Sequence, residues 1–185
     1  MIIRNAHEAD APAMGRVMVE TYLRAHKGQV PDAAWRSRQE EWSAAESAAA
    51  WARSIREIAE AGDSQECIYV AVEDVLQPEQ VIGLIMGGPT GLADYEGYGD
   101  IYALYVDFAH QGQGIGRKLI QAAARHLRQV GMTGLIIRSL STNAPANHFY
   151  ESFGGQFVGE CEAEDSGYPI TQRIYHWAEM PVGEV

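Results

Sequence analysis

The stretch Asp100-Ile-Tyr-Ala-Leu-Tyr-Val-Asp-Phe-Ala-His-Gln-Gly-Gln-Gly-Ile-Gly116, continued by the run from Arg117 to Val130, decides how this chain is expected to fold. Residues 101–106 are all apolar or aromatic, which is typical of a short strand covered on both faces. After the turn, four apolar residues recur at the spacing of one helix face: Leu119, Ile120, Ala123 and Leu127. The stretch therefore predicts a strand, a glycine-rich turn and a helix that begins within the turn.

The turn contains glycines at positions 112, 114 and 116. Because glycine has no Cβ atom, it lets backbone N–H groups come close to a ligand oxygen. The first N–H groups of a helix have no partner inside the helix, and the helix dipole adds positive charge there. This combination predicts a phosphate or pyrophosphate site. A tight turn without a ligand is the alternative that the turn alone leaves open.

Two standard nucleotide motifs do not fit the turn. A dinucleotide fingerprint counted from Gly112 needs a third glycine where Arg117 stands, and a P-loop needs Gly-Lys-Ser or Gly-Lys-Thr, which is absent. The pattern that fits is Gln-x-x-Gly-x-Gly after a strand with Leu-x-Val, formed by Gln111, Gly114, Gly116, Leu104 and Val106. This segment resembles the acetyl-CoA-binding motif of the GNAT superfamily of N-acyltransferases.

In the GNAT superfamily the backbone amides of this turn hold the CoA pyrophosphate, and the preceding strand pairs with the pantetheine arm. The resemblance therefore implies acetyl-CoA as the co-substrate. The residues that it implicates in cofactor binding are Leu104, Tyr105, Val106, Gln111, Gly112, Gln113, Gly114, Ile115, Gly116, Arg117, Asn143 and Tyr150. Phe108 departs from the family pattern, because many relatives have proline there.

A second segment, Asn143-Ala-Pro-Ala-Asn-His-Phe-Tyr150-Glu-Ser-Phe-Gly154, resembles the family pattern Asn-x-x-Ala-x-x-x-Tyr-x-x-x-Gly. Seven residues are almost two helical turns, so Asn143 and Tyr150 are expected on one side of a helix. The resemblance implies that Asn143 contacts the cofactor and that the Tyr150 hydroxyl protonates the departing thiolate. Phenol and thiol acidities are close enough for this transfer. A purely structural role for the Tyr150 ring is the alternative.

Acetyl transfer also needs a group that takes a proton from the amine, because an ammonium has no lone pair. In histone-acetylating members of the superfamily a glutamate serves as this base, and Asp100 stands at the matching position. The resemblance makes Asp100 the candidate base, acting through water because its side chain is shorter. Strand alternation places Tyr102 on the same side, and a backbone N–H near Tyr105 or Val106 is expected to bind the oxyanion. For Asp100, a solvated position at the strand entry is the alternative.

The remaining patterns predict a GNAT-like α/β fold: a mixed, mostly antiparallel sheet with a central parallel strand pair, flanked by helices. Further strands are expected at 1–5, 67–74, 81–87, 134–140, 156–161 and 170–177. Further helices are expected at 8–24, 33–61 with a break near Ser43, and 143–153. Residues 76–80 are expected to link a hairpin, and 162–168 to form a polar turn. Residues 1–185 are predicted to form a single domain.

Composition limits the functional classes. The chain has 185 residues, 46% of them hydrophobic, which suffices for one well-buried core. A formal charge of -11 argues against binding to nucleic acid or an anionic membrane and favours a cationic partner. The spacing of the two cysteines and of the histidines, His26 among them, predicts no metal site. Without a signal peptide or a membrane-spanning run, a cytoplasmic location is expected.

Together these features predict an N-acetyltransferase that transfers the acetyl group of acetyl-CoA to a primary amine of a small cationic molecule or of a peptide or protein. A non-catalytic acyl-CoA-binding regulatory module of the same fold is the alternative. A homodimer formed through the late strands is compatible with this fold.

Overall fold

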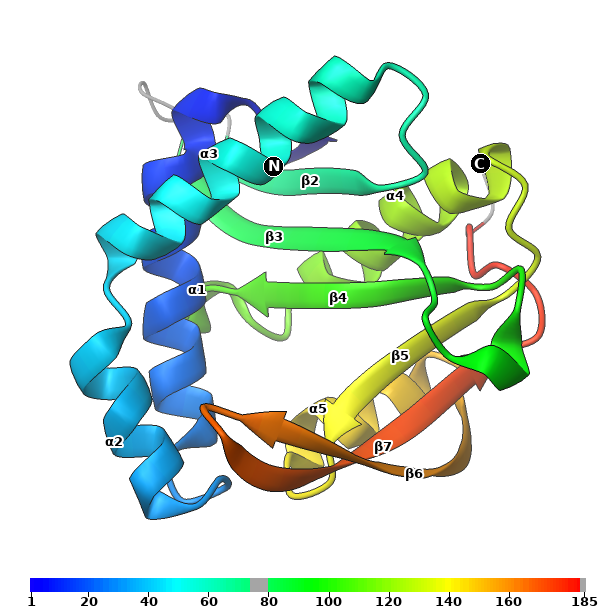
Figure 1. Cartoon of the computed structure of the whole chain (residues 1–185). Coiled ribbons are helices and arrows are strands. Elements are labelled where there is room, and N and C mark those ends of the chain that lie inside the picture. The colour runs from blue at the N-terminus through cyan, green and yellow to red at the C-terminus, as the bar shows by residue number, and fades with distance from the viewer. Residues whose placement is uncertain (74–79, 184–185) are drawn as a thin grey trace.

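The computed structural model describes residues 1–73 and 80–183, and within them one seven-stranded sheet carries helices on both faces (Figure 1). The strands are β1 (Ile2–Asn5), β2 (Cys67–Glu73), β3 (Gln80–Pro89), β4 (Gly99–Val106), β5 (Leu135–Leu140), β6 (Gln156–Asp165) and β7 (Tyr168–Trp177). Their spatial order is β1-β2-β3-β4-β5-β7-β6. Neighbouring strands are antiparallel except β4 and β5, which are parallel. The predicted mixed sheet with a central parallel pair is therefore confirmed.

The helices are α1 (Ala11–His26), α2 (Asp32–Glu41), α3 (Ala44–Ala61), α4 (Ile115–Gln129) and α5 (Ala144–Ser152). A capping box at Ser43 explains the predicted break between α2 and α3: its hydroxyl accepts the Glu46 N–H at 3.1 Å, and its own N–H donates to the Glu46 carboxylate at 3.0 Å. Gly62, at φ 70°, follows the end of α3. Among the described helices, none is both long and apolar enough to cross a membrane.

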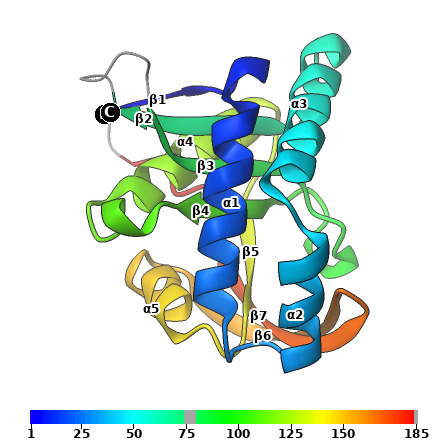
Figure 2. The same cartoon turned by 90° about the vertical axis from the view of Figure 1, so that its left-hand side faces the viewer.

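Each face of the sheet has its own apolar core. On one face, α4 and α5 pack against the strands through buried residues such as Leu119, Ile120 and Tyr150. On the other face, α1 and α3 contribute Met14, Val17, Trp51 and Ile55. Figure 2 shows α4 and α5 on one side of the strands and α3 on the other. The sheet is therefore the middle layer of three.

β4 and β5 pair only at their beginnings. The register joins residues 99–101 of β4 to 135–137 of β5, whereas β4 continues to Val106 and β5 continues along β7 (Figure 1). A β-bulge adds Tyr102 to β4, because Ala103 lies opposite Met86 and Ile101 lies opposite Gly87. Within the described sheet, the second half of β4 thus has no strand partner on its β5 side.

Two expectations need correction. β4 is not covered on both faces, because only its first three residues are buried and Tyr102 is 42% exposed. The polar turn predicted at 162–168 was wrong, because β6 and β7 extend to a short turn at 166–167. β6 lies at the edge of the sheet, where alternating acidic residues remain solvated within a strand. The hairpin link predicted at 76–80 lies largely outside the described residues, which resume at Gln80.

Candidate functional site

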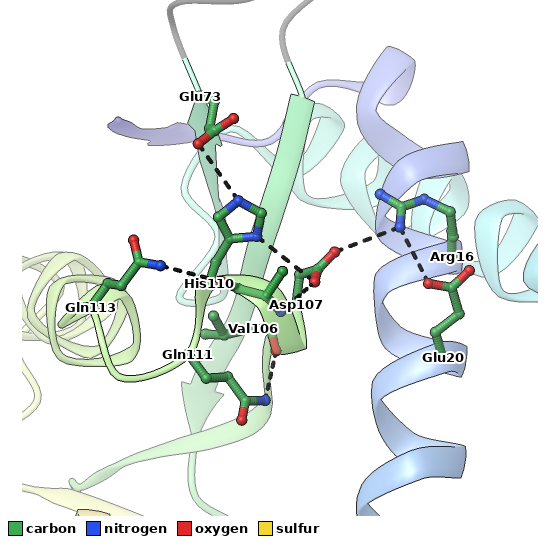
Figure 3. Close-up of polar contacts among 9 residues, drawn as sticks. Arg16, Glu20, Glu73, Val106, Asp107, His110, Gln111 and Gln113 are labelled. Carbon is green, nitrogen blue, oxygen red and sulfur yellow. Dashed lines mark hydrogen bonds and ion pairs between the residues drawn. The ribbon is translucent and has the colours of Figure 1, made fainter.

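The turn between β4 and α4 is held in shape by its own side chains. Asp107 accepts the N–H of Ala109 at 3.0 Å, which caps the short 3-10 helix Phe108–His110. The Gln111 side chain donates to the Val106 carbonyl at 2.9 Å, as Figure 3 shows. The Gln113 side chain donates to the Ala109 carbonyl at 3.3 Å. The turn is therefore fixed by local bonds, and the backbone N–H groups that begin α4 lie directly after it.

The three glycines of the turn serve two different purposes. Gly112 and Gly114 have φ angles of 75° and 77°, which lie in the left-handed region where a side chain causes strain. Gly116 has no such angle, but a Cβ atom there would lie 3.3 Å from the Phe149 ring. The first two glycines thus shape the turn, and the third lets α4 approach α5.

The carboxylates near the turn face cationic or imidazole groups. Arg16 of α1 hydrogen-bonds to Glu20 at 3.3 Å and lies 3.8 Å from Asp107 (Figure 3). The His110 ring lies between Glu73 and Asp107, with nitrogen–oxygen distances of 3.6 and 3.8 Å. This cluster links the turn to α1 and β2. In it the Asp107 carboxylate lies near Arg16 and His110, and the Glu73 carboxylate lies near His110.

A cavity of about 700 Å³ opens beside the turn and the unpaired half of β4. It is lined by Thr21, Arg24, Ala25, His26, Gln29, Leu104, Tyr105, Val106, Phe108, His110, Gln111, Gly112, Gly114, Ile115, Gly116, Arg117, Asn143, Pro145, Ala146, Phe149 and Tyr150. No aspartate or glutamate occurs among these lining residues, although the chain has 25 of them against 14 lysines and arginines. Together with the start of α4, this lining suits an elongated ligand with an anionic end.

Tyr150 reaches this cavity from α5 and is only 7% exposed. Its ring packs 5.6 Å from Tyr175 and 5.3 Å from Phe149, between centroids. Burial raises the pKa of the Tyr150 phenol above its ordinary value, and the nearby Tyr105 and Tyr175 raise it further. The hydroxyl therefore carries its proton throughout the neutral range and is available as an acid.

Asn143 is placed by the start of α5. Its side-chain oxygen accepts the Ala146 N–H at 3.3 Å, which caps the helix, and Asn143 also lines the cavity. The Asn147 side chain donates to the carbonyls of Leu140 and Ser141 at 3.2 and 3.1 Å. These bonds fix α5 to the end of β5, so the position of Tyr150 follows from the packing of the sheet.

Residues 29–155 match the family model of the acetyltransferase (GNAT) family. The chain belongs to the GNAT acetyltransferase family. Among curated GNAT relatives, the uncharacterized N-acetyltransferase YuaI of Bacillus subtilis is 30% identical over 101 residues, covering 54% of this chain and 57% of YuaI. A mycothiol acetyltransferase of Nocardiopsis dassonvillei is 41% identical over 64 residues, covering 35% of this chain and 19% of that protein. The match thus spans from about a fifth to somewhat over half of these relatives' lengths.

Solved structures support the GNAT fold over nearly the whole chain. The PaiA N-acetyltransferase of Thermoplasma acidophilum, crystallised in complex with coenzyme A, has a TM-score of 0.71 at 16% identity and covers 96% of this chain and 98% of its own. YncA of Salmonella typhimurium, described as a putative acetyltransferase with its cofactor acetyl-CoA, has a TM-score of 0.63 at 18% identity, covering 100% and 95%. At these identities the likeness concerns the fold alone.

The GNAT cavity collects most of the residues that the sequence singled out. Eleven of them line it: Leu104, Tyr105, Val106, Gln111, Gly112, Gly114, Ile115, Gly116, Arg117, Asn143 and Tyr150. Gln113 and Asp100 are not among the lining residues. The roles of all thirteen stay predictions.

Asp100 lies in a different environment from the other predicted site residues of this GNAT chain. Its carboxylate is fully buried and accepts hydrogen bonds from Arg138 at 2.8 Å and Thr90 at 3.5 Å. Burial raises the pKa of Asp100 above its ordinary value, and the Arg138 guanidinium offsets part of that rise. The hydroxyl of Tyr102 donates to the Pro89 carbonyl at 2.5 Å. The bulge at Tyr102 interrupts the simple alternation that linked it to Asp100.

His26 lines the cavity, although the sequence analysis gave it no functional role. Its Nδ1 lies 3.0 Å from the Tyr22 carbonyl, and because a carbonyl only accepts, this nitrogen carries the hydrogen. The Nε2 atom therefore keeps its lone pair. Burial lowers the pKa of His26 to about 4, so the ring is neutral at pH 7. No local pattern marks this residue, since α1 meets the turn only through the tertiary fold.

The end of β6, next to the β6–β7 turn, is hydrogen-bonded to helices α1 and α2. Asp165, which is buried, accepts hydrogen bonds from the Tyr22 hydroxyl and, at 2.8 Å, from the Arg38 guanidinium. The Arg38 guanidinium also lies 5.0 Å from the centre of the Trp42 ring. Asp165, expected within the polar turn at 162–168, instead ends β6 and is buried against α1 and α2.

A second, smaller cavity of about 250 Å³ lies between α1, α3 and the end of β3 in the GNAT fold. It is lined by Met18, Trp42, Glu46, Ser47, Ala50, Trp51, Ser54 and Met86. Two tryptophans and two methionines make it largely apolar, and Glu46 supplies the acidic group. Met86 pairs with Ala103, so the floor of this cavity adjoins the second half of β4.

Proposed function

We propose that the chain transfers the acetyl group of acetyl-CoA directly to a primary amine of a small cationic molecule or of a peptide or protein. The observation that carries this proposal is the cavity of about 700 Å³, where the glycine turn, the unpaired half of β4 and Tyr150 meet and where no lining carboxylate would repel phosphate. Family membership supports the same reaction, because the matched model is that of an acetyltransferase family.

The lining suits each part of acetyl-CoA. The N–H groups that begin α4 and the Arg117 side chain would bind the pyrophosphate. The backbone groups of β4 beyond Ile101 would pair with the pantetheine amides, in place of the strand that β5 does not supply there. Such pairing would carry the thioester inward along β4 toward Tyr150.

In the proposed reaction, the neutral amine attacks the thioester carbonyl carbon, and a C–N bond forms while the carbonyl oxygen becomes an oxyanion. A backbone N–H near Tyr105 or Val106 stabilises that oxyanion. The oxyanion then collapses, the C–S bond breaks, and the Tyr150 hydroxyl gives its proton to the departing thiolate. The amine gives up one proton to the general base, which later releases it to solvent, and the phenol regains one proton from solvent, so charge and protons balance.

We keep Asp100 as the proposed acceptor of the amine proton, acting through water. Its raised pKa brings a carboxylate closer to the range in which a general base works. Its Oδ1 atom has no hydrogen-bond partner of ordinary geometry in the described part of the chain, so it is able to accept one. The expected result for Asp100→Asn is a fall in kcat with unchanged affinity for acetyl-CoA; an unchanged kcat would remove Asp100 from the mechanism.

For the acceptor, we propose the side of β4 that carries the second cavity. Tryptophan faces attract cations, and Glu46 adds a negative charge beside Trp42 and Trp51. The formal charge of -11 adds a long-range attraction for cationic amines. Spermidine, kanamycin and a lysine-containing peptide would represent the three acceptor types, and the acetylated product identifies which type is used.

The first test is a thermal-shift titration with acetyl-CoA, with ATP and NADH as controls. A ligand at a hundred times its dissociation constant stabilises the folded chain by about 2.7 kcal/mol, which raises the melting temperature measurably. A shift with acetyl-CoA alone, followed by amine-dependent release of free CoA, is the expected result. Binding without turnover on any amine would instead favour the non-catalytic module, and no shift with acetyl-CoA would contradict both.

A further inference from the structure

Two arginines from different helices line the main cavity, and each lies over a phenylalanine ring. The guanidinium carbon of Arg24, in the last turn of α1, is 4.1 Å from the centre of the Phe108 ring. That of Arg117, in α4, is 4.9 Å from the centre of the Phe153 ring. Stacking on a ring holds the guanidinium plane but leaves the N–H groups at its edge available for a ligand.

Neither arginine has a carboxylate partner among the residues that the structure describes, and among the described arginines without such a partner these two are the ones that line the cavity. Six other arginines each lie within ion-pair distance of an acidic side chain: Arg4, Arg16, Arg38, Arg56, Arg138 and Arg173. The cavity that Arg24 and Arg117 line has no acidic side chain either. Two cations without carboxylate partners in one cavity indicate a ligand with more than one anionic group.

We propose that Arg24 binds the 3′-phosphate on the ribose of coenzyme A, a subsite separate from the pyrophosphate site. This inference rests on the proposed use of acetyl-CoA. In the proposed function the start of α4 and Arg117 bind the pyrophosphate, which leaves the third phosphate of the cofactor without an assigned partner. Phe108, the platform of Arg24, begins the short helix just before the glycine turn, so Arg24 lies next to the pyrophosphate site.

The exposure of the two arginines agrees with this arrangement. Arg24 and Arg117 are both exposed, whereas Tyr150, which lines the same cavity, is buried. A ligand that places its nucleotide at the rim and its thioester inside would meet the arginines first. A guanidinium can give a phosphate two parallel hydrogen bonds, which makes Arg24 suited to the terminal 3′-phosphate.

The test compares coenzyme A with dephospho-coenzyme A, which lacks only the 3′-phosphate, by titration calorimetry on the full chain. Unmodified protein should bind coenzyme A roughly tenfold to a hundredfold more tightly, as expected for hydrogen bonds between charged groups. In Arg24→Gln this preference should disappear through weaker binding of coenzyme A, while the affinity for dephospho-coenzyme A stays unchanged. Arg24→Lys should keep part of the preference, since it keeps the charge but not the paired donors.

Lys27→Gln is the matched control, because Lys27 is an exposed cation directly after α1 that does not line the cavity. It removes the same charge and should leave the preference intact. Equal affinities of the unmodified protein for coenzyme A and dephospho-coenzyme A would overturn the inference. An Arg24→Gln variant that binds both ligands equally less tightly would also overturn it, because Arg24 would then contact the adenine or the pyrophosphate. If neither ligand binds the unmodified protein, the proposed function fails as well.

Discussion

The Asp100 carboxylate and the Arg138 guanidinium form a hydrogen-bonded ion pair, with 2.8 Å between Oδ2 and Nη2, across the two parallel strands of the sheet. Asp100 still belongs to the paired start of β4, whereas Arg138 is the first residue of β5 beyond the pairing with β4. The Asp100 side chain is fully buried, while the Arg138 side chain is 35% exposed. The pair therefore closes the strand junction just where β4 and β5 begin to diverge.

Replacing Arg138 by methionine should destabilise the fold strongly. The change leaves a buried carboxylate without its cation, for which the expected loss is about 3–5 kcal/mol in the free energy of unfolding at neutral pH. Without Arg138 the pKa of Asp100 rises further above its unfolded value, so the variant should regain stability as the pH is lowered. Urea unfolding at several pH values measures both effects. The double change Arg138→Met with Asp100→Asn should recover most of the loss, and a double variant no more stable than Arg138→Met would contradict the pairing argument.

Replacing Tyr150 by phenylalanine should lower kcat about a hundredfold to a thousandfold, because the departing thiolate loses its proton donor. Affinity for acetyl-CoA should stay the same, since the ring still lines the cavity. Because the pKa of Tyr150 is raised, kcat of the unmodified enzyme should show no loss of the acid up to about pH 10. Tyr175→Phe is the control: its hydroxyl bonds to Glu151 at 3.2 Å and does not line the cavity. A Tyr150→Phe variant as slow as Tyr175→Phe, and no slower, would show that the phenol is not the acid.

Local sequence patterns predicted those parts of the fold that depend on near neighbours. The turn from Gln111 to Gly116 is fixed by bonds within a few residues, and Ser43 caps α3 with Glu46, three residues away. Tyr150 of α5 lines the cavity together with Asn143, the residue that caps this helix, because seven residues are almost two helical turns. In these cases the residues in contact are only a few positions apart in the sequence, so the local sequence pattern is enough to predict the contact.

The missed features depend on residues that are distant in the sequence. Arg24 and His26 line the cavity from α1, more than eighty residues before the turn that they face, and no spacing rule connects the two. Asp165 was expected within the polar turn at 162–168, yet Arg38 donates a hydrogen bond to it across 127 positions. The bulge at Tyr102 likewise arises from how β3 meets β4, which the composition of β4 alone does not reveal.

Alanine substitutions in the glycine turn should separate backbone strain from crowding. Gly114→Ala is expected to cost about 1–2 kcal/mol in the free energy of unfolding, because its φ of 77° is unfavourable for a residue with a Cβ atom, although the space around it is open. Gly116→Ala should cost less, because a small movement of the Phe149 ring relieves the 3.3 Å contact. Chemical unfolding of both variants gives the comparison. A larger loss for Gly116→Ala would mean that packing between α4 and α5 is the stronger constraint.

His26 should make the stability of the chain depend on pH below neutrality. Its pKa is about 4 in the folded chain, compared with about 6.5 for a free imidazole, so the unfolded chain binds the proton more readily. The stabilising effect of a neutral His26 is complete above pH 6.5 and is lost as the pH falls toward 4. The loss should be on the order of 1–3 kcal/mol, reduced by the partial exposure of the ring.

His26→Gln, which has no charge to gain, should show a smaller fall in the free energy of unfolding than the unmodified chain in urea unfolding between pH 7.5 and 4.5. At pH 7.5, where the imidazole is neutral in both states, the comparison isolates the ring's packing on Tyr22, 4.2 Å away between centroids. Parallel pH profiles for the two proteins would show that burial does not suppress protonation of His26, and the acid sensitivity would then belong to other groups.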